Sequence, residues 1–173
     1  MKSRVLLAAF AVVVAASAGF AAKPESSGAD PDVMLRELYK AHDAEGGPFA
    51  DRTNRKLLGQ YFTKELADLI AKDAKEADGE VGAYEFDPLY ASQDPQVKKF
   101  KIGAVQWGGI QKRADDPADE GFALVAVTFK DGGEERELRF GFEQQADKTW
   151  RISEIHYPDG TSLLQILRRA YPG

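Results

Sequence analysis

The spacing of apolar residues changes from helical to strand-like part-way along the chain. Between residues 30 and 78, apolar side chains recur at three- and four-residue intervals, as in Met34, Leu35 and Leu38. This spacing is typical of amphipathic helices. Between residues 97 and 157 the apolar positions mostly alternate or run together, which is typical of strands. The pattern predicts helices first and then a sheet.

Three helices are expected before the sheet and one after it. The first opens at Asp30-Pro31, with Asp30 as N-cap, and the second covers Arg52–Phe62. Thr63 is positioned to cap the third, which Gly79 ends. After the strands, Thr161 or Ser162 can cap a final helix that carries leucines on one face.

The expected strands are Val97–Lys112, Phe122–Lys130, Glu134–Gln144 and Trp150–Tyr157. Within the first strand the apolar residues change from even positions (Phe100, Ile102) to odd positions (Val105, Trp107), which predicts a bulge at Gly103. The second strand is apolar at nearly every position, which indicates a central strand covered on both faces. The fold class is therefore α+β: N-terminal helices packed on a bent antiparallel meander sheet, with a C-terminal helix.

The stretch Tyr84–Pro95 forms a hinge between the helical and strand segments. It contains two Asp-Pro pairs, and proline stops regular elements. Asp87 is expected to cap a short turn over Pro88–Ala91. The alternative is that Asp87 or Asp94 faces the interior, where burial would raise its pKa and make it a base or a polar anchor.

The N-terminal segment Met1–Ala22 has the features of a secretory signal peptide. Lys2 and Arg4 precede the apolar run Val5–Ala16, and small residues follow. The run is short for a membrane span. We therefore expect residues 1–22 to be removed, 23–29 to be a linker and 30–173 to be a single domain, exported to the periplasm or secreted, with no membrane insertion after cleavage.

Composition excludes several kinds of chemistry. The chain has no cysteine, so disulfides, thiol nucleophiles and Cys-ligated metals are excluded. Its formal net charge of −5 argues against a nucleic-acid partner. No His-containing cluster has zinc-like spacing, and the acidic residues of the polar turn 114–121 lack a calcium-loop pattern. We expect no metal and no cofactor.

Motifs of nucleophilic catalysis are also missing. There is no Gly-x-Ser-x-Gly elbow, and His42 and His156 are the two histidines. His42 continues an apolar helical stripe and is expected to be a hydrogen-bonded core histidine; His156 ends a strand and is expected to line a pocket mouth. Aromatic residues are candidate pocket walls, and Gln93 is expected to bond loop backbone. The candidate ligand-binding residues are Tyr39, Asp87, Tyr90, Gln93, Asp94, Trp107 and His156.

Four stretches together resemble a family of exported bacterial proteins. They are Tyr84–Asp94 (Tyr-x-Phe-Asp-Pro-x-x-x-x-Gln-Asp), Phe129–Asp131, Trp150–Ile155 and Gly160–Leu164. The chain is similar over about residues 30 to 170 to the family known as domain of unknown function 3828. That resemblance implies a cone fold of the nuclear-transport-factor-two-like (cystatin-like) superfamily. It implies no catalytic residues, and the cysteines that some members carry in the hinge are replaced here.

Three function classes follow from these observations. The first is a non-catalytic binding or interaction module, a monomer or homodimer, whose partner is a small apolar ligand or an envelope protein. The second is an isomerase- or hydratase-like enzyme that uses a hinge carboxylate. The third is an envelope immunity or inhibitor protein.

Export generates the first prediction. If residues 1–22 are a signal peptide, the mature protein should begin between Gly19 and Lys23. N-terminal sequencing of the protein from the cell envelope measures this directly, and an intact Met1 in that fraction would refute it.

Overall fold

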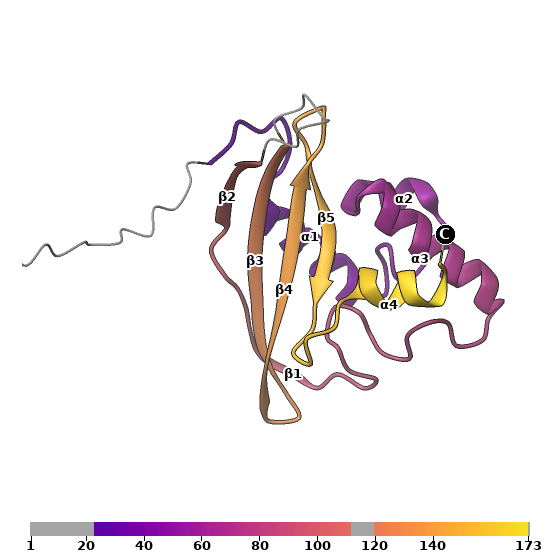
Figure 1. Cartoon of the computed structure of the whole chain (residues 1–173). Helices are drawn as coiled ribbons and strands as arrows, with labels where there is room; N and C mark the ends of the chain where they lie inside the picture. Colours follow the sequence, from indigo (N-terminus) through magenta and orange to yellow (C-terminus); the bar gives the residue numbers. More distant parts are fainter. Residues whose placement is uncertain (1–22, 112–119, 173) are drawn as a thin grey trace, which may run out of the picture.

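A computed structural model describes residues 23–111 and 120–172 of the chain (Figure 1). The predicted signal peptide and most of the acidic turn 114–121 lie outside the described residues. In order, the elements are α1 (Pro31–Asp43), α2 (Arg55–Tyr61), α3 (Lys64–Ala77), β1 (Val97–Ile102), β2 (Gln106–Gln111), β3 (Glu120–Asp131), β4 (Glu134–Gln144), β5 (Trp150–His156) and α4 (Leu163–Ala170).

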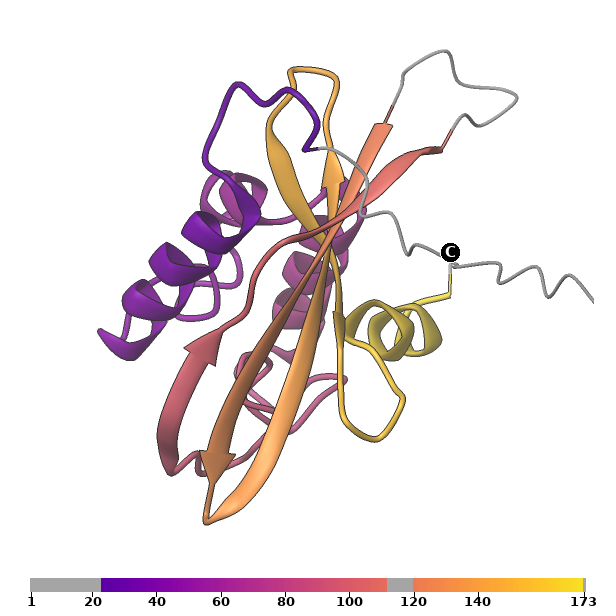
Figure 2. The ribbon, with the colours of Figure 1, turned by 90° about the vertical axis from the view of Figure 1, so that its left-hand side faces the viewer.

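The described elements form one antiparallel sheet with helices against one side of it. The strand order is β1-β3-β4-β5, and β2 also pairs with β3. Figure 1 shows α1 behind the sheet and α2, α3 and α4 to its right, and Figure 2 turns the sheet's other side toward the viewer. The predicted α+β class is confirmed. The finer expectation, a cone of the nuclear-transport-factor-two type, stays a prediction.

Helix starts follow the capping pattern in part. The side chains of Asn54 and Ser162 accept hydrogen bonds from the first turns of α2 and α4. Asp30 and Thr63 occupy the N-cap positions of α1 and α3, but neither side chain makes a capping hydrogen bond. The carboxylate of Asp30 instead accepts from Lys23 Nζ at 2.6 Å. The expected cap Ser162 is therefore confirmed, whereas Asp30 and Thr63 stand at the expected N-cap positions without the expected hydrogen bond.

The predicted single strand Val97–Lys112 is wrong, because the structure divides it into β1 and β2. Its register against β3 shifts between Lys98 and Lys101, where Lys99 has φ 54°. It shifts by one residue again between Ile102 and Gln106, the stretch that contains the expected bulge site Gly103. At Gly103 the chain leaves the strand while its N–H still donates to Ala126 O at 2.8 Å. A Cβ there would lie 3.0 Å from the same oxygen, so this close approach favours glycine.

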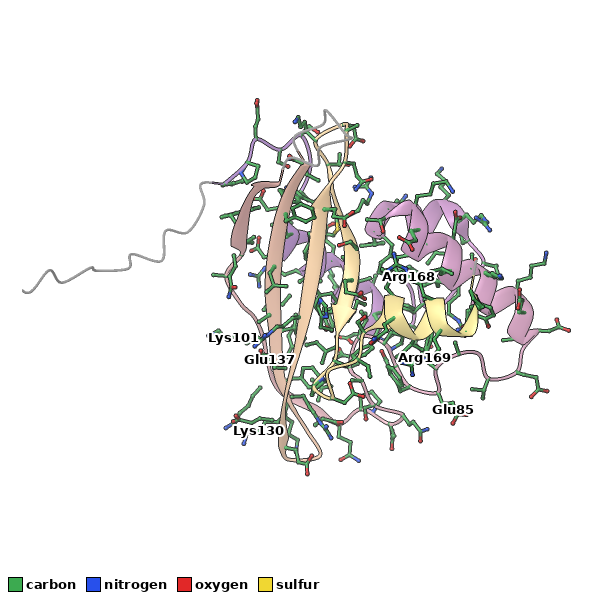
Figure 3. The ribbon with its side chains drawn as sticks, in the orientation of Figure 1. Glu85, Lys101, Lys130, Glu137, Arg168 and Arg169 are labelled. Atoms are coloured by element: carbon green, nitrogen blue, oxygen red, sulfur yellow. The ribbon has the colours of Figure 1, made fainter. Side chains whose placement is uncertain are left out.

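The prediction that β3 is covered on both faces is also wrong. Ala123, Val125, Val127 and Phe129 are buried, whereas the residues between them are half-buried. In the described part of the chain the helices cover one face alone. Lys101 and Glu137 lie on the other, outer face, where both flank Thr128 in the sheet (Figure 3). An apolar run alone does not show whether a second layer covers a strand.

The core lies between the helices and the inner face of the sheet. Its largest fully buried side chains include Trp150, Phe62, Phe140 and Phe142. These rings occupy the space that a ligand-binding cone would leave open. Among the described residues, no helix is long and apolar enough to span a membrane.

Phe140 tests the register of β4. Its side chain is fully buried, so Phe140→Ala should lower the free energy of unfolding by about 3–5 kcal/mol. The matched control is Phe100→Ala, because Phe100 is 40% exposed and should cost clearly less. Urea unfolding of both variants gives the comparison, and a loss below about 1 kcal/mol for Phe140→Ala would contradict the burial of this face.

Candidate functional site

The hinge segment and the end of α1 enclose a surface pocket of about 530 Å³. Aromatic and apolar side chains form much of its wall, and charged groups from three parts of the chain reach it. The lining residues are His42, Phe49, Arg52, Glu80, Val81, Gly82, Tyr84, Glu85, Phe86, Asp87, Pro88 and Gln93. We call this hollow the hinge pocket.

Asp87 shapes the turn at the base of the hinge pocket. Its Oδ1 accepts from Leu89 N at 2.8 Å, and its carbonyl accepts from Ala91 N at 2.7 Å. Its own N–H donates to Ser92 O at 2.8 Å, which closes the turn. The expected capping role is confirmed. The second carboxylate oxygen makes a contact that sequence reasoning missed, with His42.

His42 and Asp87 form a half-buried ion pair. His42 Nε2 lies 2.6 Å from Asp87 Oδ2, and the side chains are 18% and 20% exposed. The hydrogen bond to Asp87 raises the pKa of His42, an effect that burial opposes and the charges of Asp87 and Asp43 reinforce. The other ring nitrogen, Nδ1, makes no hydrogen bond with any described residue. His42 is hydrogen-bonded as expected, but it lines a pocket rather than the core.

Arg52 is held in a similar way by a buried carboxylate on α3. Its Nη1 donates to Asp73 Oδ2 at 2.9 Å and to the Tyr84 hydroxyl at 3.3 Å. The guanidinium carbon lies 5.5 Å from the centre of the Tyr84 ring. The Asp73 side chain is fully buried and also accepts from Ala83 N at 2.6 Å and the Tyr171 hydroxyl at 2.9 Å. Arg52 is therefore fixed in position by a buried carboxylate that accepts three hydrogen bonds.

Two of the predicted site residues, Asp87 and Gln93, line the hinge pocket. Tyr39 and Tyr90 lie behind it, because both are buried and hold the turn in place. The Tyr39 hydroxyl donates to Leu89 O at 2.7 Å, and the Tyr90 hydroxyl donates to Asp43 at 2.5 Å. Burial raises the pKa of both phenols, so they act as neutral donors.

The other three predicted residues lie away from the hinge pocket. Asp94 is exposed and makes no hydrogen bond or ion pair with the described residues. Trp107 packs against Trp150, with ring centres 5.5 Å apart. His156 is exposed at the end of β5 and lines a different pocket. The seven candidate residues thus do not form a single site.

Sequence reasoning missed Arg52 and the aromatic wall. A usable signal for Arg52 was present in α3, where Asp73 follows Leu66 and Ile70 at helical spacing on the buried face. A carboxylate in that position requires a cation and hydrogen-bond donors. The sequence does not show which of the nearby basic residues supplies them.

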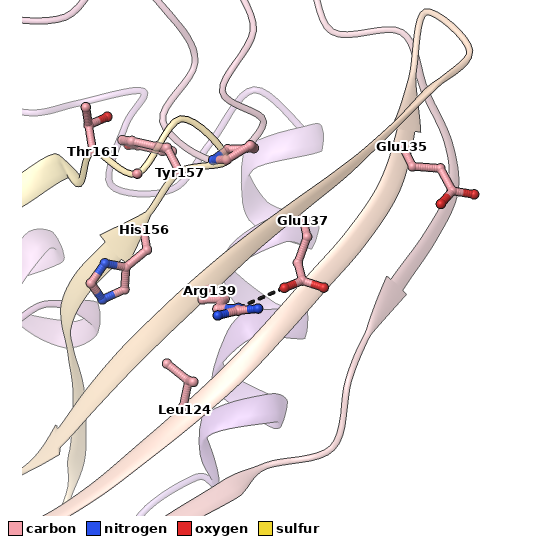
Figure 4. Close-up of a pocket in the computed structure, with 9 residues that line it drawn as sticks. Leu124, Glu135, Glu137, Arg139, His156, Tyr157 and Thr161 are labelled. Atoms are coloured by element: carbon pink, nitrogen blue, oxygen red, sulfur yellow. Dashed lines mark hydrogen bonds and ion pairs between the residues drawn. The ribbon is translucent and has the colours of Figure 1, made fainter.

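The outer face of the sheet carries a larger hollow of about 650 Å³ (Figure 4). Leu124, His156 and Thr161 line it together with the charged pair Arg139 and Glu137. Arg139 Nε lies 2.8 Å from Glu137 Oε1, and these side chains are 61% and 45% exposed. Water screens such exposed charges, so this hollow holds its polar groups less firmly than the hinge pocket does.

The described residues contain no group of three or more His, Asp or Glu side chains that could hold a metal ion. In the hinge pocket His42 pairs with Asp87, and Arg52 pairs with Asp73 behind the wall. Their arrangement supports hydrogen bonding to a bound molecule within an apolar wall.

The His42–Asp87 pair predicts a pH-dependent stability. Because the folded-state pKa of His42 is raised, its contribution is fully present below the ordinary histidine pKa of about 6.5 and is lost as pH rises through the raised value. Urea unfolding of wild type and His42→Gln should differ most at the acidic end of the range from about pH 6 to 9. His156→Gln is the exposed control. A difference for His42→Gln that does not change with pH would contradict the pair.

Comparison with known proteins adds one distant likeness. No protein-family model and no curated protein matches the chain. Among solved structures, the phospholipid-binding protein from Ralstonia solanacearum in complex with a phospholipid is 19% identical, and the match covers 81% of this chain and 73% of that one. Its TM-score is 0.32, which is too low to carry an argument about this chain.

Proposed function

We propose that this chain is an exported, non-catalytic binding protein whose hinge pocket takes a small, largely apolar molecule. One observation carries the proposal: His42 and Arg52 line an aromatic-walled hollow, and each is held from behind by a carboxylate. Such a combination of apolar wall and few oriented polar groups is typical of small-molecule sites. Export is part of the proposal and rests on the N-terminal pattern of residues 1–22.

The wall of the pocket supports an apolar ligand. Phe49 and Phe86 are half-buried there, and Val81 is 62% exposed at the rim. A ligand that covers these side chains would remove apolar surface from water, which favours binding by about 25 cal/mol per Å² before the costs of association. The volume of about 530 Å³ is within the range of small-ligand sites.

The hydrogen bonds of Asp87 favour a binding role for the hinge pocket over a catalytic role for this carboxylate. Both oxygens of Asp87 are engaged, one by Leu89 N and the other by His42. A general base must reach the proton that it removes, and this carboxylate is directed at the protein itself. Its role in the proposal is to orient His42. The fixed floor also reduces the entropy that a ligand must lose to order the site.

A neutral apolar fluorophore tests the proposed site. N-phenyl-1-naphthylamine should bind the mature chain, and Phe86→Ala should weaken that binding by about tenfold, because the ring's buried area is lost. Fluorescence titration gives the affinity. Since Phe86 also packs on Tyr157, the rim variant Val81→Ser provides a second test with little risk to folding, and it should weaken binding several-fold.

Phe100→Ala is the matched control, because Phe100 is a partly exposed ring outside the hinge pocket. It should leave the affinity for the fluorophore unchanged. The proposal is wrong if the wild-type chain does not bind the fluorophore, or if both pocket variants bind it as tightly as wild type.

A further inference from the structure

We infer that the hinge pocket recognises the carboxylate head group of a singly charged amphiphile, through N–H donors of His42 and Arg52. This inference rests on the proposed function and names the class of ligand. It follows from which polar atoms of the pocket are already bonded and which remain available.

His42 supplies the first donor. His42 Nε2 lies 2.6 Å from Asp87 Oδ2, and this carboxylate raises the pKa of His42 and so favours the protonated imidazole. In that form Nδ1 also carries a proton, and it has no partner among the described residues. A half-buried N–H that lacks a protein acceptor favours a ligand that brings one.

Arg52 supplies the second set of donors. Asp73 and the Tyr84 hydroxyl engage Nη1, whereas Nε and Nη2 make no hydrogen bond with the described residues. The guanidinium lies against the Tyr84 ring, so its plane is fixed and the side chain is 27% exposed. A guanidinium with two free N–H groups on one edge matches the two oxygens of a carboxylate.

The carboxylate oxygens at the base of the hinge pocket already accept hydrogen bonds from the protein. Both oxygens of Asp87 accept hydrogen bonds, from Leu89 N and His42, and the two oxygens of Asp73 accept three between them. The floor therefore presents donors and few free acceptors to a ligand. The remaining carboxylates, Glu80 and Glu85, are exposed at the rim, where solvent screens them. Their residual negative charge repels a doubly charged head group more strongly than a singly charged one, so a monoanion fits better than a dianion.

The apolar wall accounts for the rest of the ligand. Phe49, Phe86 and Val81 line the same hollow as His42 and Arg52. An alkyl or similar chain can lie on these side chains while its carboxylate meets the two donors. A simple carboxylate without a chain would lose this apolar contact and bind weakly.

Calorimetric titration of the mature chain with three ligands of matched chain length tests the inference. The probes are decanoate, decanol and decylamine, at about pH 6, which is below the ordinary histidine pKa that Asp87 raises in His42, so that His42 carries charge. Decanoate should bind at least about tenfold more tightly than decanol, as charge-assisted hydrogen bonds imply, and decylamine should bind most weakly. Acetate should bind far more weakly than decanoate.

Arg52→Lys is the decisive variant, because lysine keeps a cation near the buried Asp73 but removes the planar edge of N–H groups. It should remove most of the preference for decanoate over decanol, because it weakens decanoate binding far more than decanol binding. Arg55→Lys is the control, since Arg55 pairs with Asp68 at an exposed position on α2. His42→Gln should likewise reduce the preference for decanoate over decanol.

The outcomes separate the two proposals. If decanol binds as tightly as decanoate, or decylamine binds more tightly, the head-group inference is wrong while the apolar pocket stands. If none of the three ligands binds, both the inference and the proposed function are wrong. A thermal melt of each variant shows whether it is folded, and a preference that survives in folded Arg52→Lys and His42→Gln also overturns the inference.

Discussion

The structure depends on satisfying the backbone of a segment that is neither helix nor strand. Residues 79–96 connect α3 to β1, and part of this segment is buried against the helices and the sheet. Buried N–H and C=O groups without partners are costly. Side chains from distant elements supply the partners: Asp73 accepts from Ala83 N, and Tyr39 donates to Leu89 O. The segment is ordered because its neighbours replace the bonds of regular structure.

The same interactions create the hinge pocket. Asp73 must be compensated by a cation, and Arg52 provides it while one edge of the guanidinium stays available. Asp87 must close its turn, and its second oxygen then orients His42. Gly82 lies so close that a Cβ would be 2.4 Å from a carboxylate oxygen of Asp73. The side chains that stabilise the hinge segment are therefore the same ones to which we assign ligand contacts in the proposed function.

The two faces of the sheet differ in the burial and charge of their side chains. The inner face is packed with large aromatic and aliphatic side chains, whereas the outer face combines half-buried residues of β3 with charged residues such as Arg139. That charged residue pairs with Glu137 on the same strand, so its hydrogen-bonding capacity is partly used. The space between helices and sheet, where a cone would hold its ligand, is occupied by Phe140, Phe142 and Trp150. The accessible hollows described here open at the surface.

The sequence by itself determined the elements and the fold class. The signals for them depend only on residues that are close in sequence. They are the change of period after residue 96, the alternation of Leu138, Phe140 and Phe142, and the turn residues at the hinge. It also determined that Asp87 caps its turn, since this contact spans two residues. The division into β1 and β2 and the irregularity between Lys98 and Lys101 escaped it, because the register of these strands depends on β3 rather than on their own residues.

The tertiary structure alone decided which side chains meet. His42 and Asp87 are 45 positions apart, and Arg52 and Asp73 are 21 apart. No periodicity within one element links such pairs, because their distance depends on how α1, α3 and the hinge pack together. For the same reason Trp107 and His156, plausible pocket residues by type, lie away from Asp87. Local patterns determine which elements form, and packing between them determines which groups share a pocket.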